Sequence, residues 1–232
     1  MHARLLAGFR HRLRALLAAL PAEERHGEVE RLIVEAHERS GREGLSVADA
    51  LFLVHEELRA RGGPAARTAS AAAPADGAAP AFLCDPSLGG LARWLRAAGY
   101  DARLAPEVPV HRLPDEAHAR GLVLLTSDAE TLERRIAVDG SLRLVWLPCA
   151  LHTAQKLALV LRDLGLPLRE PRCMACGGEL VARPKEAVRP RIPPRTALWK
   201  DEYFVCASCE RLFWQGTHWQ RIVPALREAA AA

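Results

Sequence analysis

The sequence predicts an α/β protein built around a parallel sheet, with a helical module before it and a cysteine-rich unit after it. From residue 81, apolar runs of strand length alternate with amphipathic stretches of helix length, which is the pattern of a parallel sheet covered by helices. Two CxxC pairs follow this region, and three stretches with helical spacing precede it. We expect five segments: a helical module at 1–61, a flexible linker at 62–80, the α/β domain at 81–170, a metal-bound ribbon at 171–222 and a C-terminal tail at 223–232.

The composition is that of a soluble globular protein without a membrane span. Of the 232 residues, 50% are hydrophobic and 26% are charged, and no apolar run approaches the roughly 20 residues that a spanning helix needs. Arg10, Arg12 and Arg14 interrupt the apolar N-terminus, so we do not expect a secretory signal, while composition alone leaves an organellar transit peptide open. We expect a cytoplasmic protein, because paired CxxC motifs in such a chain are typical of metal binding in a reducing compartment.

Residues 1–61 have the spacing of three amphipathic helices. The first carries leucines and Phe9 at helical intervals up to Pro21, the second lies around 29–36, and the third opens at Ser46 and Asp49, which are spaced as a capping box. We expect this module to bind a protein partner or to self-associate. Residues 62–80, with nine Ala, three Gly, three Pro and no large apolar residue, are expected to form a flexible linker.

The α/β domain is expected to contain four strands, at 81–84, 101–104, 122–126 and 142–148. Helices are expected at 88–99, 113–121, 128–138 and 151–165. In sheets of this kind, sites form beyond the carboxyl ends of the strands. Two carboxylates occupy this position, because Asp85 follows the first strand and Asp128 follows the third.

Asp85 and Asp128 have two interpretations from their position alone. Each is placed to cap the helix that follows it, since Asp is a favoured N-cap residue. Each is also placed to hold Mg²⁺ or Mn²⁺, which bind carboxylate oxygens and, in nucleases, activate water and stabilise charge on the phosphate. The neighbouring acids considered to complete such a site are Glu107, Asp115, Glu116 and Glu130.

The stretches "FLCDPSLGGLARWLRAAGYDARL" and "GLVLLTSDAETLERR" resemble the Mut-seven C-terminal RNase domain family, a branch of the PIN-like nucleases. The resemblance covers about residues 81–222, with several motifs in the family's order and a zinc ribbon at the end. It implies a PIN-like α/β sandwich and metal-dependent cleavage of RNA. On this resemblance, Asp85 and Asp128 are metal ligands.

The chain departs from the family pattern at several points. Gly90 stands where the family usually has Lys, and "TSD" at 126–128 replaces the usual "TRD". The stretch after the second strand is poor in acids, and "LPCALHTAQ" after the fourth strand contains no carboxylate. With few acidic ligands, the affinity for the catalytic metal is expected to be weak.

The cysteines of the two CxxC pairs predict a structural zinc site. Cys173 and Cys176 are separated from Cys206 and Cys209 by 29 residues. Four thiolates give Zn²⁺ a closed tetrahedral shell with no open position for water. Disulfides or a redox dithiol are the alternatives for these four residues. Cys84 and Cys149 stand alone and are expected to be small buried hydrophobic residues.

The C-terminal segment carries the net charge of the whole chain, which is +4. Residues 171–232 hold ten basic and six acidic residues, while the other segments are balanced. Cations interleaved with aromatic residues are typical of single-stranded RNA binding, although aromatics also pack small ribbons. The residues expected to contact RNA are Arg93, Arg183, Lys185, Arg189, Arg191, Arg195, Lys200 and Trp199.

Three classes of function follow from these patterns. The leading hypothesis is a Mg²⁺- or Mn²⁺-dependent ribonuclease in which Asp85 and Asp128 bind the metal, assisted in catalysis by Asp115 or Glu116. The second is a non-catalytic RNA- or ribosome-binding protein that keeps the fold and the ribbon. The third is a protein–protein adaptor that acts through residues 1–61.

Overall fold

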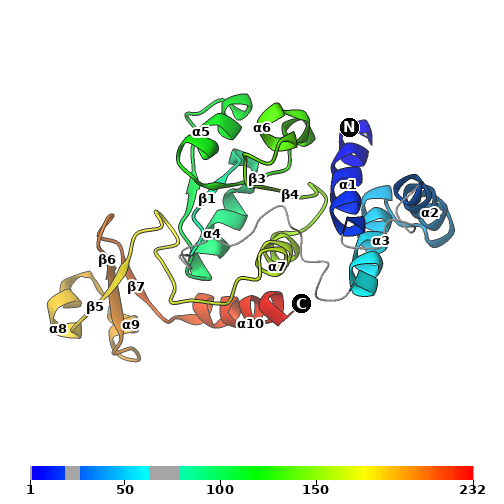
Figure 1. Ribbon diagram of the computed structural model, residues 1–232. Helices are drawn as coiled ribbons and strands as arrows, with labels where there is room; N and C mark the ends of the chain where they lie inside the picture. Colours follow the sequence, from blue (N-terminus) through cyan, green and yellow to red (C-terminus); the bar gives the residue numbers. More distant parts are fainter. Residues whose placement is uncertain (1, 19–26, 63–78, 232) are drawn as a thin grey trace.

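The computed structural model describes residues 2–18, 27–62 and 79–231, so most of the expected linker lies outside the described residues. Figure 1 shows three parts: the N-terminal helices, a central α/β body and a small C-terminal sheet on the side of the body away from those helices. We call residues 171–216, which contain this small sheet, the ribbon.

The central sheet has four short strands, all parallel. They are β1 (Phe82–Cys84), β2 (Ala102–Leu104), β3 (Val123–Thr126) and β4 (Leu144–Trp146), in the order β2-β1-β3-β4. Every residue of β1, β3 and β4 is buried, as expected of parallel strands that are covered on both faces. The parallel sheet predicted from the alternating pattern is therefore confirmed.

Alternate strand residues feed two hydrophobic cores, one on each face of the sheet. One face is covered by α4 (Gly89–Ala97), α7 (Thr153–Asp163) and α10 (Thr217–Ala231). The other is covered by α5 (Leu113–Ala119) and the N-terminal helices. The body also includes α6 (Arg135–Val138) and three short 3₁₀ helices, η4 (Pro86–Leu88), η5 (Val110–Arg112) and η6 (Ala129–Glu133).

The helix expected at 128–138 is instead two pieces. Residues Ala129–Glu133 form η6, and Arg135–Val138 form α6. Arg134 between them has extended backbone angles (φ −68°, ψ 140°), so one continuous helix does not form. The side chain of Arg134 turns to α5 and contacts Asp115.

The N-terminal helices pack directly on the α/β body. They are α1 (His2–Leu17), α2 (Glu28–Glu43) and α3 (Val47–Gly62), and the N–H of Asp49 donates to Ser46 Oγ as the capping box requires. Phe9 of α1 meets Trp146 of β4 edge to face, with ring centroids 5.4 Å apart. Gly8 lies so close to Trp146 that a Cβ there would be 2.2 Å from the indole. Residues of all three helices therefore share a core with the sheet.

A buried group of charged residues also joins α1 and α3 to α7. Arg12 is 6% exposed, and it donates to Asp163 Oδ2 at 2.5 Å, to Trp146 O at 2.9 Å and to His55 Nε2 at 3.2 Å. Arg162 donates two hydrogen bonds of 2.8 Å to Glu56. These contacts hold the N-terminal helices in one position on the α/β body, because a buried charge is costly unless a partner pairs or hydrogen-bonds with it.

The ribbon is an antiparallel sheet in the order β5-β6-β7, made of β5 (Leu180–Arg183), β6 (Tyr203–Cys206) and β7 (Leu212–Trp214). Between β5 and β6 lie α8 (Lys185–Val188), η7 (Arg189–Arg191) and α9 (Pro194–Ala197), which form a small core around Val188, Ile192 and Tyr203. After the ribbon, α10 runs back along α7 (Figure 1). This helix continues across residues 222 and 223, where we expect from the sequence a boundary between the ribbon and a C-terminal tail. No helix among the described residues is long and apolar enough to cross a membrane.

Candidate metal centre and acidic edge

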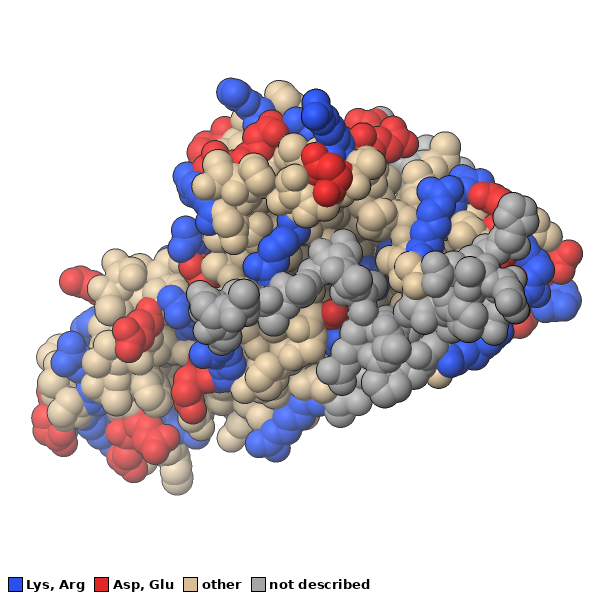
Figure 2. All heavy atoms as spheres, viewed as in Figure 1, with Lys and Arg blue, Asp and Glu red and all other residues tan. Residues whose placement is uncertain are grey.

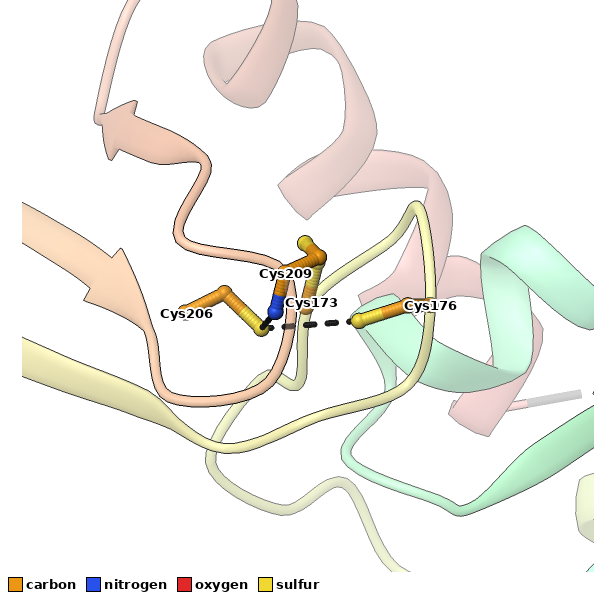
Figure 3. Close-up of side chains that lie close together, drawn as sticks. All are labelled: Cys173, Cys176, Cys206 and Cys209. Atoms are coloured by element: carbon orange, nitrogen blue, oxygen red, sulfur yellow. Dashed lines mark hydrogen bonds between the residues drawn. The ribbon is translucent and has the colours of Figure 1, made fainter.

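The four cysteines of the CxxC pairs converge on one point in the ribbon (Figure 3). Cys173 and Cys176 come from the loop before β5, Cys206 is the last residue of β6, and Cys209 comes from the turn after β6. Their four sulfur atoms lie within 4.8 Å of one another. The Sγ atoms of Cys173 and Cys209 are 3.6 Å apart, and those of Cys176 and Cys206 are 3.5 Å apart.

This arrangement fits a structural zinc ion. Zn–S bonds of about 2.3 Å in a tetrahedron place the sulfur atoms about 3.8 Å apart, which is close to the separations observed. Backbone N–H groups of Ser208 and Cys209 also point to Cys206 Sγ. Although burial raises the pKa of Cys206, these N–H groups together with the thiols of Cys176 and Cys209 lower it to about 6, which favours the thiolate form of this sulfur. The predicted four-cysteine site is assembled as expected.

The two lone cysteines differ from each other. Cys84 is buried in β1, and burial raises the pKa of its thiol to about 12. Cys149 is exposed in the loop after β4, so the expectation that it is buried is wrong. The chain leaves the sheet at the buried Pro148, and the side chain of Cys149 after it is exposed to solvent.

Asp85 lies at the carboxyl end of β1, and both of its carboxylate oxygens are engaged. Its side chain is largely buried, with only 6% exposed. Oδ1 accepts from Ser87 N at 2.7 Å, which is the capping contact at the start of η4. Oδ2 accepts from Thr126 Oγ1 at 3.1 Å and from Ser127 N at 3.4 Å. Asp85 is thus both a cap and the centre of a link to β3.

Asp128 lies on the same edge of the sheet and is joined to Asp85 through Thr126. The Thr126 hydroxyl donates to Asp85 and accepts from Asp128 N at 3.0 Å. Asp128 Oδ1 caps η6 by accepting from Glu130 N at 3.1 Å. The fold therefore brings both aspartates to one edge, and each also satisfies the ordinary capping interpretation.

Apart from Glu130, which follows Asp128 in the first turn of η6, the other candidate acids do not gather around this pair. Asp115 binds Arg134 at 3.0 Å, and Glu116 forms an ion pair with Arg120 at 2.5 Å. Glu107 is exposed in the loop after β2. In the described part of the chain, the cysteine cluster is the only group of three or more His, Cys, Asp or Glu side chains close enough to hold an ion.

Two polar residues beside Asp85 were not singled out from the sequence. Ser127 Oγ is buried and has no hydrogen-bond partner among the described residues. Lys156 of α7 donates to Cys149 O at 3.3 Å; burial lowers the pKa of its amine, while Cys149 and Asp85 act against this effect. Ser127 was visible within "TSD". Lys156 directly follows "LPCALHTAQ", the stretch after the fourth strand that contains no carboxylate.

Comparison with known proteins gives one result. The model of the family described as "Mut7-C RNAse domain" matches residues 80–226, which is more than half of the chain. The chain belongs to this family. No curated protein and no solved structure matches it.

In this Mut7-C chain, the ribbon and the acidic edge lie at opposite ends of β1. The Phe82 N–H at the start of β1 donates to Asp101 O, whereas Asp85 follows its last residue. Arg96, in the last turn of α4, donates to Met174 O and Ala175 O in the cysteine loop. The ribbon is therefore anchored at the amino end of the strand, roughly 10 Å along β1 from Asp85.

The residues expected to contact RNA are spread over the ribbon and α4. Arg93 lies on the exposed side of α4 and lines a groove with Arg211 and Phe213. Trp199 is 81% exposed after α9, and Lys185 forms an ion pair with Asp201 at 2.8 Å. The others lie on β5, in the helical segments that follow it and in the loop before β6: Arg183, Arg189, Arg191, Arg195 and Lys200.

Proposed function

We propose that this protein is a metal-dependent ribonuclease with a PIN-like fold, acting in the cytoplasm, whose active edge holds Asp85 and Asp128. The observation that carries the proposal is the convergence of these two carboxylates, through Thr126, at the carboxyl end of the parallel sheet in a Mut7-C RNase domain. Sites in parallel sheets form at this end. The cytoplasm suits the four zinc-binding thiols, which need a reducing compartment.

The residues of the edge fit a Mg²⁺ or Mn²⁺ ion that binds together with RNA. Mg²⁺ keeps several waters and is commonly held by only one or two carboxylates plus substrate phosphates. Asp85 and Asp128 supply two carboxylates, and Ser127 Oγ, which has no partner among the described residues, leaves one polar atom for a bound water or phosphate oxygen. When bound, the metal would activate water and stabilise charge on the phosphate.

The protein's own groups have separate roles in this proposal. Asp85 is fixed by three hydrogen bonds, so its carboxylate is held in one orientation before substrate arrives. Lys156 lies near Asp85 and would bring a positive charge to the scissile phosphate. Asp115 and Glu116 would assist only after leaving their arginine partners.

The proposal is tested by cleavage of single-stranded RNA in Mn²⁺ by the full zinc-loaded chain and by the Asp128→Asn variant. We expect Asp128→Asn to lower the cleavage rate about a hundredfold or more while leaving RNA affinity unchanged or higher. Asn keeps an oxygen that can accept the Glu130 N–H, so the cap on η6 is retained.

Asp139→Asn is the matched control. Asp139 Oδ1 accepts from Ser141 N at 2.9 Å, which is the same contact two residues along the chain that Asp85 and Asp128 make. It precedes β4 and so lies away from the carboxyl ends of the strands. Equal rates for Asp128→Asn, Asp139→Asn and the wild type would contradict the proposal.

A non-catalytic RNA-binding protein is the second candidate. It is favoured by the absence of a third acid beside Asp85 and Asp128 among the described residues. In that case the wild type shows no Mn²⁺-dependent cleavage, and the changes Arg189→Ala, Arg191→Ala and Arg195→Ala together remove RNA binding. An adaptor acting through residues 1–61 would instead show no RNA affinity at physiological salt.

A further inference from the structure

We propose that the cavity between the ribbon and the α/β body binds a base of single-stranded RNA by stacking it on Phe213 and Phe204. The proposal rests on the ribonuclease function above for its ligand class, since the family match points to RNA. It adds a second site at the end of the sheet away from Asp85.

The cavity has a volume of about 780 Å³ and is lined by both parts of the molecule. From the ribbon come Phe204, Phe213 and Trp214, and from α10 comes Trp219. Gly99 and the segment 169–172 form the wall on the side of the body. A volume of this size is in the range of sites for small organic ligands, so a nucleotide has room.

Phe204 and Phe213 have no evident packing role. They are opposite each other in the β6–β7 register, so their side chains share one face of the ribbon sheet. Both are only partly buried. Within the part of the chain that the structure describes, neither belongs to the three hydrophobic cores or packs against them, whereas their neighbours Val205, Leu212 and Trp214 pack on the ribbon core. Two aromatic faces are therefore available to a ligand.

The charges of the cavity favour a base inside and phosphates at its edge. Arg169 and Arg172 line it together with Glu170 and Glu179, so the lining has no net charge. Such a wall offers both donors and acceptors to the edges of a base.

Cations lie in the groove next to the cavity. This groove shares Phe213 and Met174 with the cavity and adds Arg93 and Arg211. Neither arginine forms an ion pair in the described part of the chain, and both are exposed. Figure 2 shows Lys and Arg side chains along the junction of the ribbon and the body. The groove thus suits the phosphates of a strand whose base occupies the cavity.

The experiment compares two fluorescent probes, a short oligouridylate and an abasic ribose-phosphate oligomer of the same length, bound to the full zinc-loaded chain without added Mg²⁺ or Mn²⁺. Stacking predicts that the wild type binds the oligouridylate about fivefold to a hundredfold more tightly than the abasic oligomer. Phe213→Leu should lose most of this difference and leave the affinity for the abasic oligomer unchanged. Phe213→Trp, which keeps an aromatic face, should restore it.

Two results would overturn the proposal. One is equal binding of both probes by the wild type, which would mean that phosphates alone hold RNA and would leave the cavity to another ligand, such as an apolar peptide. The other is a loss of affinity in Phe213→Leu that is the same for both probes, with zinc content and melting temperature unchanged. Failure of the ribonuclease function is recognised separately, as base-dependent binding without any Mn²⁺-dependent cleavage.

Discussion

Asp85 shows how one residue satisfies two interpretations at once. One of its oxygens caps η4, and the other accepts from the Thr126 hydroxyl on the neighbouring strand. A residue that served only as a cap would need just the first contact. The second contact cannot be predicted from the residues around Asp85, because it depends on β1 and β3 being adjacent in the sheet.

His55 is the residue whose protonation should most affect stability. It lies on α3 among Arg12 of α1, Glu56 of its own helix and Asp163 of α7. Burial, followed by the charge of Arg12, lowers the pKa of His55 to about 4. In the unfolded chain the ordinary His pKa is about 6.5, so between these two values the unfolded state binds the extra proton.

We therefore predict that the free energy of unfolding falls as the pH drops from about 6.5 to about 4, by about 3 kcal/mol from His55. Although burial by itself raises the pKa of Glu56, its contacts with His55 and Arg162 lower it to about 2. The stability that Glu56 contributes above about pH 4.5 is lost below it. Urea denaturation at a series of pH values measures how steeply the free energy of unfolding changes with pH. An unchanged slope in His55→Gln would contradict the assignment to His55.

Single residues differed in how far the sequence revealed them. The four cysteines were found because CxxC spacing is itself the geometry of a zinc ligand pair. Asp85 and Asp128 were found because strand ends in a parallel sheet share an edge. Lys156 was missed as a site residue, because only the tertiary packing brings it to Asp85. Phe204 and Phe213 belong to the aromatics that we expect from the sequence either to stack on RNA or to pack the ribbon, and only the structure separates them from those that pack on the ribbon core.

At the scale of elements, α1 is part of the body rather than a separate surface helix. Its hydrophobic side was visible in the sequence, but its partner was not, since helical periodicity does not say what covers an apolar face. Arg12 interrupts that face in the sequence. In the structure it is buried against Asp163 and Trp146 O.

We predict that Arg12→Met destabilises the protein by about 3–5 kcal/mol, because it leaves Asp163 and the neighbouring carbonyl without the buried arginine. Arg10→Met is the matched control on the same helix. Arg10 pairs with Glu30 at the surface, where their side chains are 34% and 59% exposed, and exposed pairs contribute about 0–1 kcal/mol. Urea denaturation of both variants gives the comparison. Equal losses would show that the docking of α1 does not depend on Arg12.

The ribbon is the element that should depend on metal. Its own core contains only three buried hydrophobic residues, Val188, Ile192 and Tyr203, so zinc binding should supply much of its folding free energy. We predict that the wild type carries one zinc per chain and that Cys209→Ser loses it, with faster proteolysis in 184–200. Cys149→Ser changes an exposed cysteine outside the cluster. This variant should keep its zinc and its resistance to proteolysis. Metal analysis that finds zinc in Cys209→Ser would contradict the tetrahedral site.

At the scale of the whole molecule, the acidic edge and the ribbon lie at opposite ends of β1, with α4 between them. α4 begins four residues after Asp85 and ends beside the cysteine loop. Arg93 lies one turn before Arg96 on this helix and borders the groove at the ribbon. In the proposed function, a strand held by the ribbon would pass along α4 to reach Asp85. The sequence predicts both ends but not their separation, which follows from the anchoring of the ribbon by Arg96.

This separation predicts that ribbon cations help only RNA long enough to reach both ends. Replacing Arg189, Arg191 and Arg195 by Ala should weaken binding of long single strands and reduce the slope of log affinity against log salt by about 2. It should leave cleavage of the shortest substrates unchanged. Replacing Arg31, Arg39 and Arg42 of α2 removes the same charge elsewhere and is the control. An equal effect of both triple changes would show that only net charge matters.

The most direct test of the active edge is the binding of Mn²⁺, followed by the electron paramagnetic resonance signal of the free ion. We predict little loss of this signal with protein alone, and a clear loss when a cleavage-resistant RNA is added, because two carboxylates and a phosphate hold the ion together. Asp85→Asn/Asp128→Asn should show no loss with or without RNA, while Asp139→Asn should behave as wild type. Equal Mn²⁺ binding by the double variant and the wild type would contradict the assignment of this edge as the metal site.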